Sequence, residues 1–157
     1  MDKTFCNCAA LQKIELPESV VEIGSDAFSG CASLDEIVIP GEVKKIGSSA
    51  FNGCKALKTV SLGSAIEEIA GSAFAGCNLI EEKILPKTVG QQAFNGCSGL
   101  KKISFNPEMT VIDKNTFNGC TSLIDIVIPD AVTEIREGAF SGCTNLRSIT
   151  LPSGSRY

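Results

Sequence analysis

The sequence has 157 residues and a formal net charge of -4, so it lacks the basic excess that is typical of nucleic-acid-binding proteins. Hydrophobic residues make up 43% of the chain and charged residues 20%, a balance that is too apolar for a disordered polypeptide. No apolar run approaches the roughly 18 residues that a membrane helix needs. We therefore expect no nucleic-acid partner and no membrane insertion by this segment.

A short sequence built around a phenylalanine recurs along the whole chain, as in Ala27-Phe28-Ser29-Gly30-Cys31. The anchor phenylalanines are Phe5, Phe28, Phe51, Phe74, Phe94, Phe117 and Phe140. Successive anchors are 23 residues apart, except for one interval of 20 residues. A fixed period of this length predicts a solenoid, in which each unit packs only on its neighbours. We therefore predict a single repeat domain over residues 1–157, with about seven repeats of 23 residues.

The first part of each unit follows the pattern Leu-x-x-Ile-x-Ile-Pro. The alternation of apolar and variable residues predicts a short strand, which the proline ends because it cannot donate a ladder hydrogen bond. The predicted strands are Ile14–Leu16, Ile37–Ile39, Val60–Leu62, Ile103–Phe105, Ile126–Ile128 and Ile149–Leu151. One such strand per turn makes a parallel sheet. Because parallel crossovers are nearly always right-handed, we predict a β-rich, right-handed superhelix.

The rest of the unit predicts a second wall and a corner. The pattern Val-x-x-Ile-Gly, as in Val43…Ile46-Gly47, predicts a shorter strand on the opposite wall. The pattern Ala-Phe-x-Gly-Cys predicts a tight corner with a short 3₁₀ turn, in which the phenylalanine fills the core. The glycine of this corner is expected to adopt a positive φ, which costs glycine little.

The eight cysteines follow the repeat rather than a disulfide framework. All but Cys6 lie three residues after an anchor phenylalanine. These are Cys8, Cys31, Cys54, Cys77, Cys97, Cys120 and Cys143. Stacked turns hold their Cβ vectors parallel rather than convergent, which disfavours disulfides. We therefore predict a buried ladder of free thiols that behave as small hydrophobic groups, which leaves the redox compartment open.

One unit departs from the pattern. The interval from Phe74 to Phe94 is three residues short, and the missing residues fall between Pro86 and Val89. The same unit places Lys83 where the other units have an inward aliphatic residue. A buried, unpaired lysine is costly. Either the strand bulges so that Ile84 turns inward, or Lys83 reaches solvent along its flexible stem; we favour the bulge.

The sequence offers little for catalysis. It contains no histidine, which excludes Ser-His-Asp and Cys-His chemistry and every histidine metal site. Glycine-rich phosphate loops and calcium-loop motifs are also missing from the sequence. We therefore predict a protein that is not an enzyme, with no catalytic, cofactor-binding or metal residues and no cofactor.

The full unit Leu-x-x-Ile-x-Ile-Pro-x-x-Val-x-x-Ile-Gly-x-x-Ala-Phe-x-Gly-Cys, repeated from Thr4 to Pro152, resembles the leucine-rich repeat of the BspA-like class of cell-surface proteins. The resemblance implies a leucine-rich-repeat superhelix. It also implies a non-enzymatic module for protein binding and cell adhesion, whose partner is a host or matrix protein or a surface glycoprotein. The location implied for the parent protein is the cell surface or the secreted fraction. An intracellular scaffold or inhibitor of one protein partner is the alternative.

The termini bear on this choice. The first residues have no signal-peptide character, and neither end carries the polar capping unit that a solenoid usually needs. We therefore expect the chain to be a fragment of a longer repeat array. A signal peptide and an anchor in the parent gene would favour the surface over the scaffold, and the oligomeric state stays open.

Two rows of side chains are predicted to project outward from the sheet, where a solenoid presents its extended binding surface. The candidate protein-binding face consists of Lys13, Glu15, Glu36, Val38, Thr59, Ser61, Glu82, Ile84, Lys102, Ser104, Asp125, Val127, Ser148 and Thr150. An ordinary solvated sheet face is the competing interpretation. Val38 and Val127 stand out, because they are apolar and lie beside the charged Glu36 and Asp125. Apolar anchors inside a charged rim are typical of protein interfaces.

Overall fold

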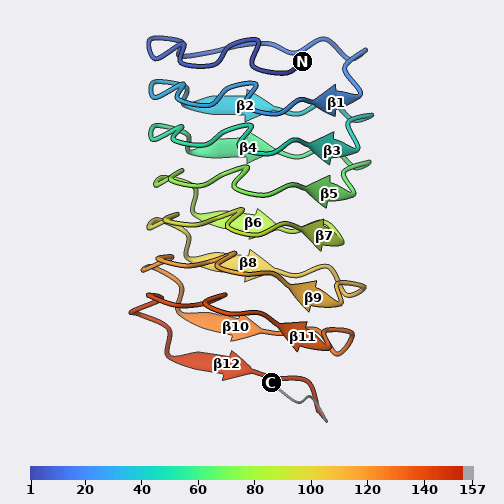
Figure 1. Cartoon of the computed structure of the whole chain (residues 1–157), viewed down its shortest axis with the longest axis vertical. Coiled ribbons are helices and arrows are strands. Elements are labelled where there is room, and N and C mark those ends of the chain that lie inside the picture. The colour runs from blue at the N-terminus through green and yellow to red at the C-terminus, as the bar shows by residue number, and fades with distance from the viewer. Residues whose placement is uncertain (154–157) are drawn as a thin grey trace.

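In the computed structural model, which describes residues 1–153, the chain forms a solenoid with its termini at opposite ends of the stack (Figure 1). Within that range the regular structure consists of short strands, with no helix. The strands of one wall are β2 (Glu36–Val38), β4 (Thr59–Ser61), β6 (Glu82–Ile84), β8 (Lys102–Ser104), β10 (Asp125–Val127) and β12 (Ser148–Thr150). Those of the other wall are β1 (Glu22–Ile23), β3 (Lys45–Ile46), β5 (Glu68–Ile69), β7 (Thr88–Val89), β9 (Val111–Ile112) and β11 (Glu134–Ile135).

Every strand pairing is parallel, as one strand per turn requires. On the second wall, β1, β3, β5 and β7 form one continuous sheet, and β9 pairs with β11. On the first wall the strands pair as β2–β4, β6–β8 and β10–β12. The predicted parallel-sheet solenoid is therefore confirmed, but the ladder of the first wall is interrupted between β4 and β6 and between β8 and β10.

The strands of the first wall begin one residue earlier than predicted. Each is centred on its inward residue, such as Ile37, which is buried between exposed neighbours. The strand predicted at residues 14–16 was wrong, because these residues pair in no ladder. They lie in the first turn, which has a neighbour on one side only.

The corner is a series of hydrogen-bonded turns, and the predicted 3₁₀ turn was wrong. The amides of Ser29 and Cys31 donate to the carbonyls of Asp26 and Phe28 at 3.1 Å each. Two residues of each corner are left-handed, Asp26 at φ 54° and Gly30 at φ 75° in this turn, so a helical run cannot continue. The expectation of a positive φ for the glycine was right. Other amides reach the next turn of the solenoid, as from Phe28 to the carbonyl of Ala50 at 2.7 Å.

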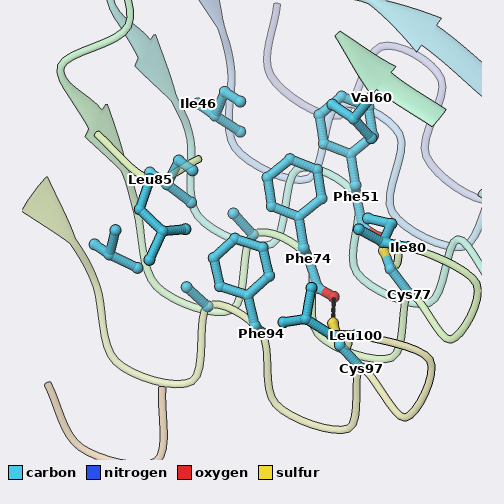
Figure 2. Packing of buried hydrophobic residues seen from close by; sticks show 14 of the residues in the cluster. Ile46, Phe51, Val60, Phe74, Cys77, Ile80, Leu85, Phe94, Cys97 and Leu100 are labelled. Carbon is cyan, nitrogen blue, oxygen red and sulfur yellow. Dashed lines mark hydrogen bonds between the residues drawn. The ribbon is translucent and has the colours of Figure 1, made fainter. Parts of the chain in front are cut away.

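The anchor phenylalanines form one stack through the core. Consecutive ring centroids are 5.2–5.7 Å apart and their planes are nearly parallel. Figure 2 shows Phe51, Phe74 and Phe94 lying one above the other. The five inner rings are buried, whereas Phe5 and Phe140 are only half-buried because each has a neighbouring ring on one side.

The cysteines form the predicted ladder of free thiols. From Cys31 onward, each thiol of the ladder donates a hydrogen bond to the carbonyl oxygen of the phenylalanine one turn earlier, as from Cys97 to Phe74 at 3.1 Å (Figure 2). Cysteine therefore fills a small apolar site and also satisfies a buried carbonyl. Burial raises the pKa of Cys97 to about 12. Cys8 is exposed and Cys143 half-buried, so the prediction of burial failed for these two cysteines of the end turns.

Candidate functional site

The outward rows of the first wall form the surface that we call the strand face, defined by the fourteen residues predicted above. All fourteen are exposed. The register places Glu36 beside Thr59 and Val38 beside Ser61. The same arrangement recurs further along, where Ile84 lies beside Ser104 and Val127 beside Thr150. The structure thus aligns charged and polar residues in one row. The other row consists of aliphatic and hydroxyl residues, apart from Glu15 in the first turn.

Three aliphatic side chains protrude from the second of these rows. Val38 is 66% exposed, Val127 is 68% exposed and Ile84 is 77% exposed. These values are high for large hydrophobic residues, which are usually among the more buried types. The three side chains belong to β2, β10 and β6, so they are distributed along the stack rather than gathered in one patch.

A hollow of about 670 Å³ lies where the ladder is interrupted between β8 and β10. Its walls are largely apolar and include Phe105, Ile124 and Val127. Phe105 packs edge-on against the buried ring of Phe117, with centroids 5.9 Å apart. The sequence analysis missed this hollow. The available signal was Phe105-Asn106 in place of the usual Ile-Pro, and an isoleucine at a normally variable position.

The short turn that contains Lys83 has no bulge, so the bulge that we favoured from the sequence was wrong. β6 is a regular strand in which Lys83 pairs with Ile103 in register, and Ile84 points outward. Lys83 is half-buried, and its Nζ donates to the carbonyl of Val60 at 3.0 Å. Burial lowers the pKa of Lys83. The lysine therefore occupies the first interruption of the ladder, between β4 and β6.

Several ion pairs link neighbouring turns on the surface. Lys13 Nζ lies 3.3 Å from a Glu36 oxygen, and Lys101 Nζ lies 2.9 Å from a Glu81 oxygen. All four side chains are more than half exposed, so each pair contributes little to stability. Of these two pairs, Lys13–Glu36 lies on the strand face, at its N-terminal end.

The described part of the chain offers no cluster of three or more cysteine, aspartate or glutamate side chains that is arranged to hold a metal ion. Within the same residues, no helix is long and apolar enough to cross a membrane. What the geometry provides is an extended, exposed face with apolar protrusions and shallow hollows.

This arrangement is that of a leucine-rich repeat solenoid. The sequence comparison identifies the family within that class. The chain matches the BspA type leucine-rich repeat region in six copies, over residues 1–89 and 83–157. The chain therefore belongs to the BspA-type leucine-rich repeat family, which is a family of repeat proteins. No curated protein sequence matches it significantly.

Solved structures of bacterial leucine-rich repeat proteins resemble the fold. A protein from Bacteroides ovatus is 28% identical with a TM-score of 0.69, over 88% of this chain and 43% of that one. A protein from Treponema pallidum is 35% identical with a TM-score of 0.55, over 92% of this chain and 57% of that one. A cell surface protein from Faecalibacterium prausnitzii is 24% identical with a TM-score of 0.58, over 98% and 63%. The chain thus spans roughly half the length of these proteins.

Proposed function

We propose that this chain is a non-enzymatic protein-binding module that acts at a cell surface and binds its partner through the strand face. The observation that carries the proposal is the exposure of Val38, Ile84 and Val127 on a face that is otherwise polar. Burying an aliphatic side chain stabilises a complex by about 1.5–3 kcal/mol. Solenoids use such extended surfaces for binding, since their inward rows are consumed by packing.

The surroundings of the aliphatic residues support an interface. Glu36 and Asp125 are exposed on the same strands as Val38 and Val127, which gives each anchor a charged neighbour. Interfaces concentrate their energy in a few apolar anchors, and their rim is polar. The competing explanation is that valine is favoured in strands wherever it faces, and the experiment below separates the two.

The proposed location rests on relatives. The similar protein from Faecalibacterium prausnitzii is described as a cell surface protein, and the family resemblance points to surface-displayed adhesins. A host or matrix protein, or a surface glycoprotein, is therefore the proposed partner class.

The test is a binding assay with purified extracellular-matrix glycoproteins immobilised on a surface. A Val38→Lys/Val127→Lys variant is expected to lose most of its binding, because each substitution places a charge at an apolar contact. Its melting temperature should stay close to that of the unmodified protein, since both positions are exposed. Val21→Lys is the matched control: Val21 is 65% exposed and precedes β1, away from the strand face. Unchanged binding by the folded double variant would remove the strand face from the proposal.

A further inference from the structure

The interruption between β4 and β6 leaves a gap in the strand face. No backbone hydrogen bond joins residues 58–62 to residues 81–85, although both segments are bonded to their other neighbours. The Nζ of Lys83 bridges the gap by donating to the carbonyl of Val60 at 3.0 Å. An ammonium group has three N–H donors, and this is its single hydrogen bond within the described residues. Two donors are therefore left for a ligand.

The charge of Lys83 lies without an anionic partner among the residues that the structure describes. It forms no ion pair with a carboxylate in the described residues. Burial lowers the pKa of Lys83, and the groups that act in the opposite direction are the thiols of Cys77 and Cys97. Burial raises the pKa of both thiols, to about 12 for Cys97, so they are neutral at pH 7. A half-buried cation without a counter-charge is unfavourable, and an anion placed beside it would recover part of that cost.

Lys83 contributes to the lining of two hollows. The first, of about 420 Å³, is lined by the aliphatic groups of Val60, Leu62 and Ile84 together with Glu82, Lys83, Lys102 and Ser104. The second, of about 470 Å³, is lined by Lys58, Thr59, Val60, Leu79, Glu81, Glu82 and Lys83. The residues around the first hollow are thus two lysines, one serine, three aliphatic residues and a single glutamate.

This lining selects among anions. Glu82 lines both hollows, and its carboxylate penalises a doubly charged group such as phosphate more than a singly charged one. The aliphatic residues favour a ligand that carries methylene groups next to its charge. A glutamate side chain has both properties, because a singly charged carboxylate ends a short hydrocarbon stem.

We propose that the gap between β4 and β6 is a subsite for a glutamate side chain of the protein partner, with Lys83 as its counter-charge and Lys102 and Ser104 beside it. This inference rests on the proposed binding role of the strand face and adds to it one point of recognition by charge. In the complex, the carboxylate of the partner's glutamate side chain accepts hydrogen bonds from Lys83. The methylene groups of the same side chain lie against Val60 and Ile84.

The experiment uses the whole chain and two short peptides. Acetyl-Ala-Glu-Ala-amide is titrated into protein with ¹³C-labelled lysine, and acetyl-Ala-Gln-Ala-amide serves as the uncharged match. The glutamate peptide is expected to move the Lys83 ¹³Cε resonance in a saturable way and to raise the pKa of Lys83, since a bound carboxylate favours the charged form. The glutamine peptide should do neither.

Two variants locate the effect. Lys83→Met keeps the length of the side chain and is expected to weaken binding of the glutamate peptide, followed here by the Lys102 ¹³Cε resonance, by about tenfold or more, as loss of a charged hydrogen bond does. Lys55→Met is the control, because Lys55 is exposed at a corner and lines neither hollow. A Lys83 resonance that does not respond to the glutamate peptide, or that responds equally to both peptides, would overturn the subsite. In that case, loss of binding by the Val38→Lys/Val127→Lys variant would still support the strand face.

Discussion

The corner and the strand face differ at the level of the short turn: the corner is continuous there, whereas the strand face is interrupted. The turn between Phe74 and Phe94 is three residues short. The corner continues through it: the two rings are 5.5 Å apart, and the Phe74 amide donates to Ala93 at 2.8 Å. The first wall is interrupted at the same level, between β4 and β6.

The difference reflects how many kinds of contact join consecutive turns in each region. The corner joins consecutive turns by backbone hydrogen bonds, ring stacking and thiol donation to a carbonyl, all at one position of the repeat. On the first wall, each three-residue strand directs one side chain inward and is joined to its neighbour by the ladder. At β6, Lys83 stands in place of the inward aliphatic residue, and its Nζ donates to the carbonyl of Val60 where the ladder is open. The strand face is thus interrupted at a level where the corner stays continuous.

The largest expected effect is a loss of stability at alkaline pH. Burial raises the pKa of Cys54 and of Cys97 from 9.0 to about 12. Above pH 9 the unfolded chain loses these thiol protons while the folded chain keeps them, so the free energy of unfolding falls as pH rises from about 9 to 12. Each buried thiol contributes a slope of up to about 1.4 kcal/mol per pH unit. Urea denaturation between pH 7 and 11, with reductant present, measures this dependence of the free energy of unfolding on pH.

Because Cys54 lies in a regular turn and Cys97 follows the short one, this measurement also tests the continuity of the corner. Cys54→Ala and Cys97→Ala are each expected to reduce the slope by a similar amount. A slope that changes only for Cys54→Ala would mean that the corner is open at the short turn.

The next effect concerns the ring stack. Phe51→Ala and Phe117→Ala should each lower the free energy of unfolding by about 3–5 kcal/mol, because each leaves a cavity in a close-packed core. Phe5→Ala is the matched control and should cost clearly less, since Phe5 is half-buried at the end of the stack. Urea denaturation gives all three values, and equal losses at Phe5 and Phe51 would contradict the stack as described.

A smaller change, this time a gain in the free energy of unfolding, is expected at the interruption between β4 and β6. Lys83→Ile restores the aliphatic residue of the regular turns and removes a half-buried charge, so it should raise the free energy of unfolding by about 1–3 kcal/mol. Lys102→Ile on the adjacent strand β8 is exposed and should change it by less than about 0.5 kcal/mol. A destabilised Lys83→Ile variant would show that the bond to Val60 contributes more than the burial of the charge costs.

The periodic part of this fold could be predicted from the sequence because each turn repeats the same packing. Phe28 and Cys31 recur with fixed spacing, so their stacked positions follow directly, and the outward residues follow from alternation. The contact of Lys83 with Val60 could not be predicted from the repeat pattern, because it depends on the distance between β4 and β6. The hollow beside Phe105 was missed for a similar reason. A period fixes which residues align, but not whether their backbones pair.

A second left-handed position in the corner was also missed, because its occupants share no side-chain type. They are Lys3, Asp26, Ser49, Ser72, Gln92, Asn115 and Gly138, with φ between 51° and 70°. Only the last of these is a glycine, the residue that adopts this conformation without strain. Asparagine and aspartate tolerate it better than other residues with a side chain. The position therefore carries a small strain that differs from turn to turn.

The smallest expected effect follows from this strain. Gln92 has a φ of 58°, and relief of its left-handed strain by Gln92→Gly is worth about 1 kcal/mol. The greater freedom of glycine in the unfolded chain offsets part of this gain, which leaves a net stabilisation of about 0.5 kcal/mol. Asn115→Gly should give no gain, because asparagine is already suited to the conformation. Gln92→Ala removes the side chain but keeps the strain, so it should give no gain either. Urea midpoints of the three variants are the measurement. Stabilisation by Gln92→Ala equal to that by Gln92→Gly would mean that the side chain, and not the backbone, carries the strain.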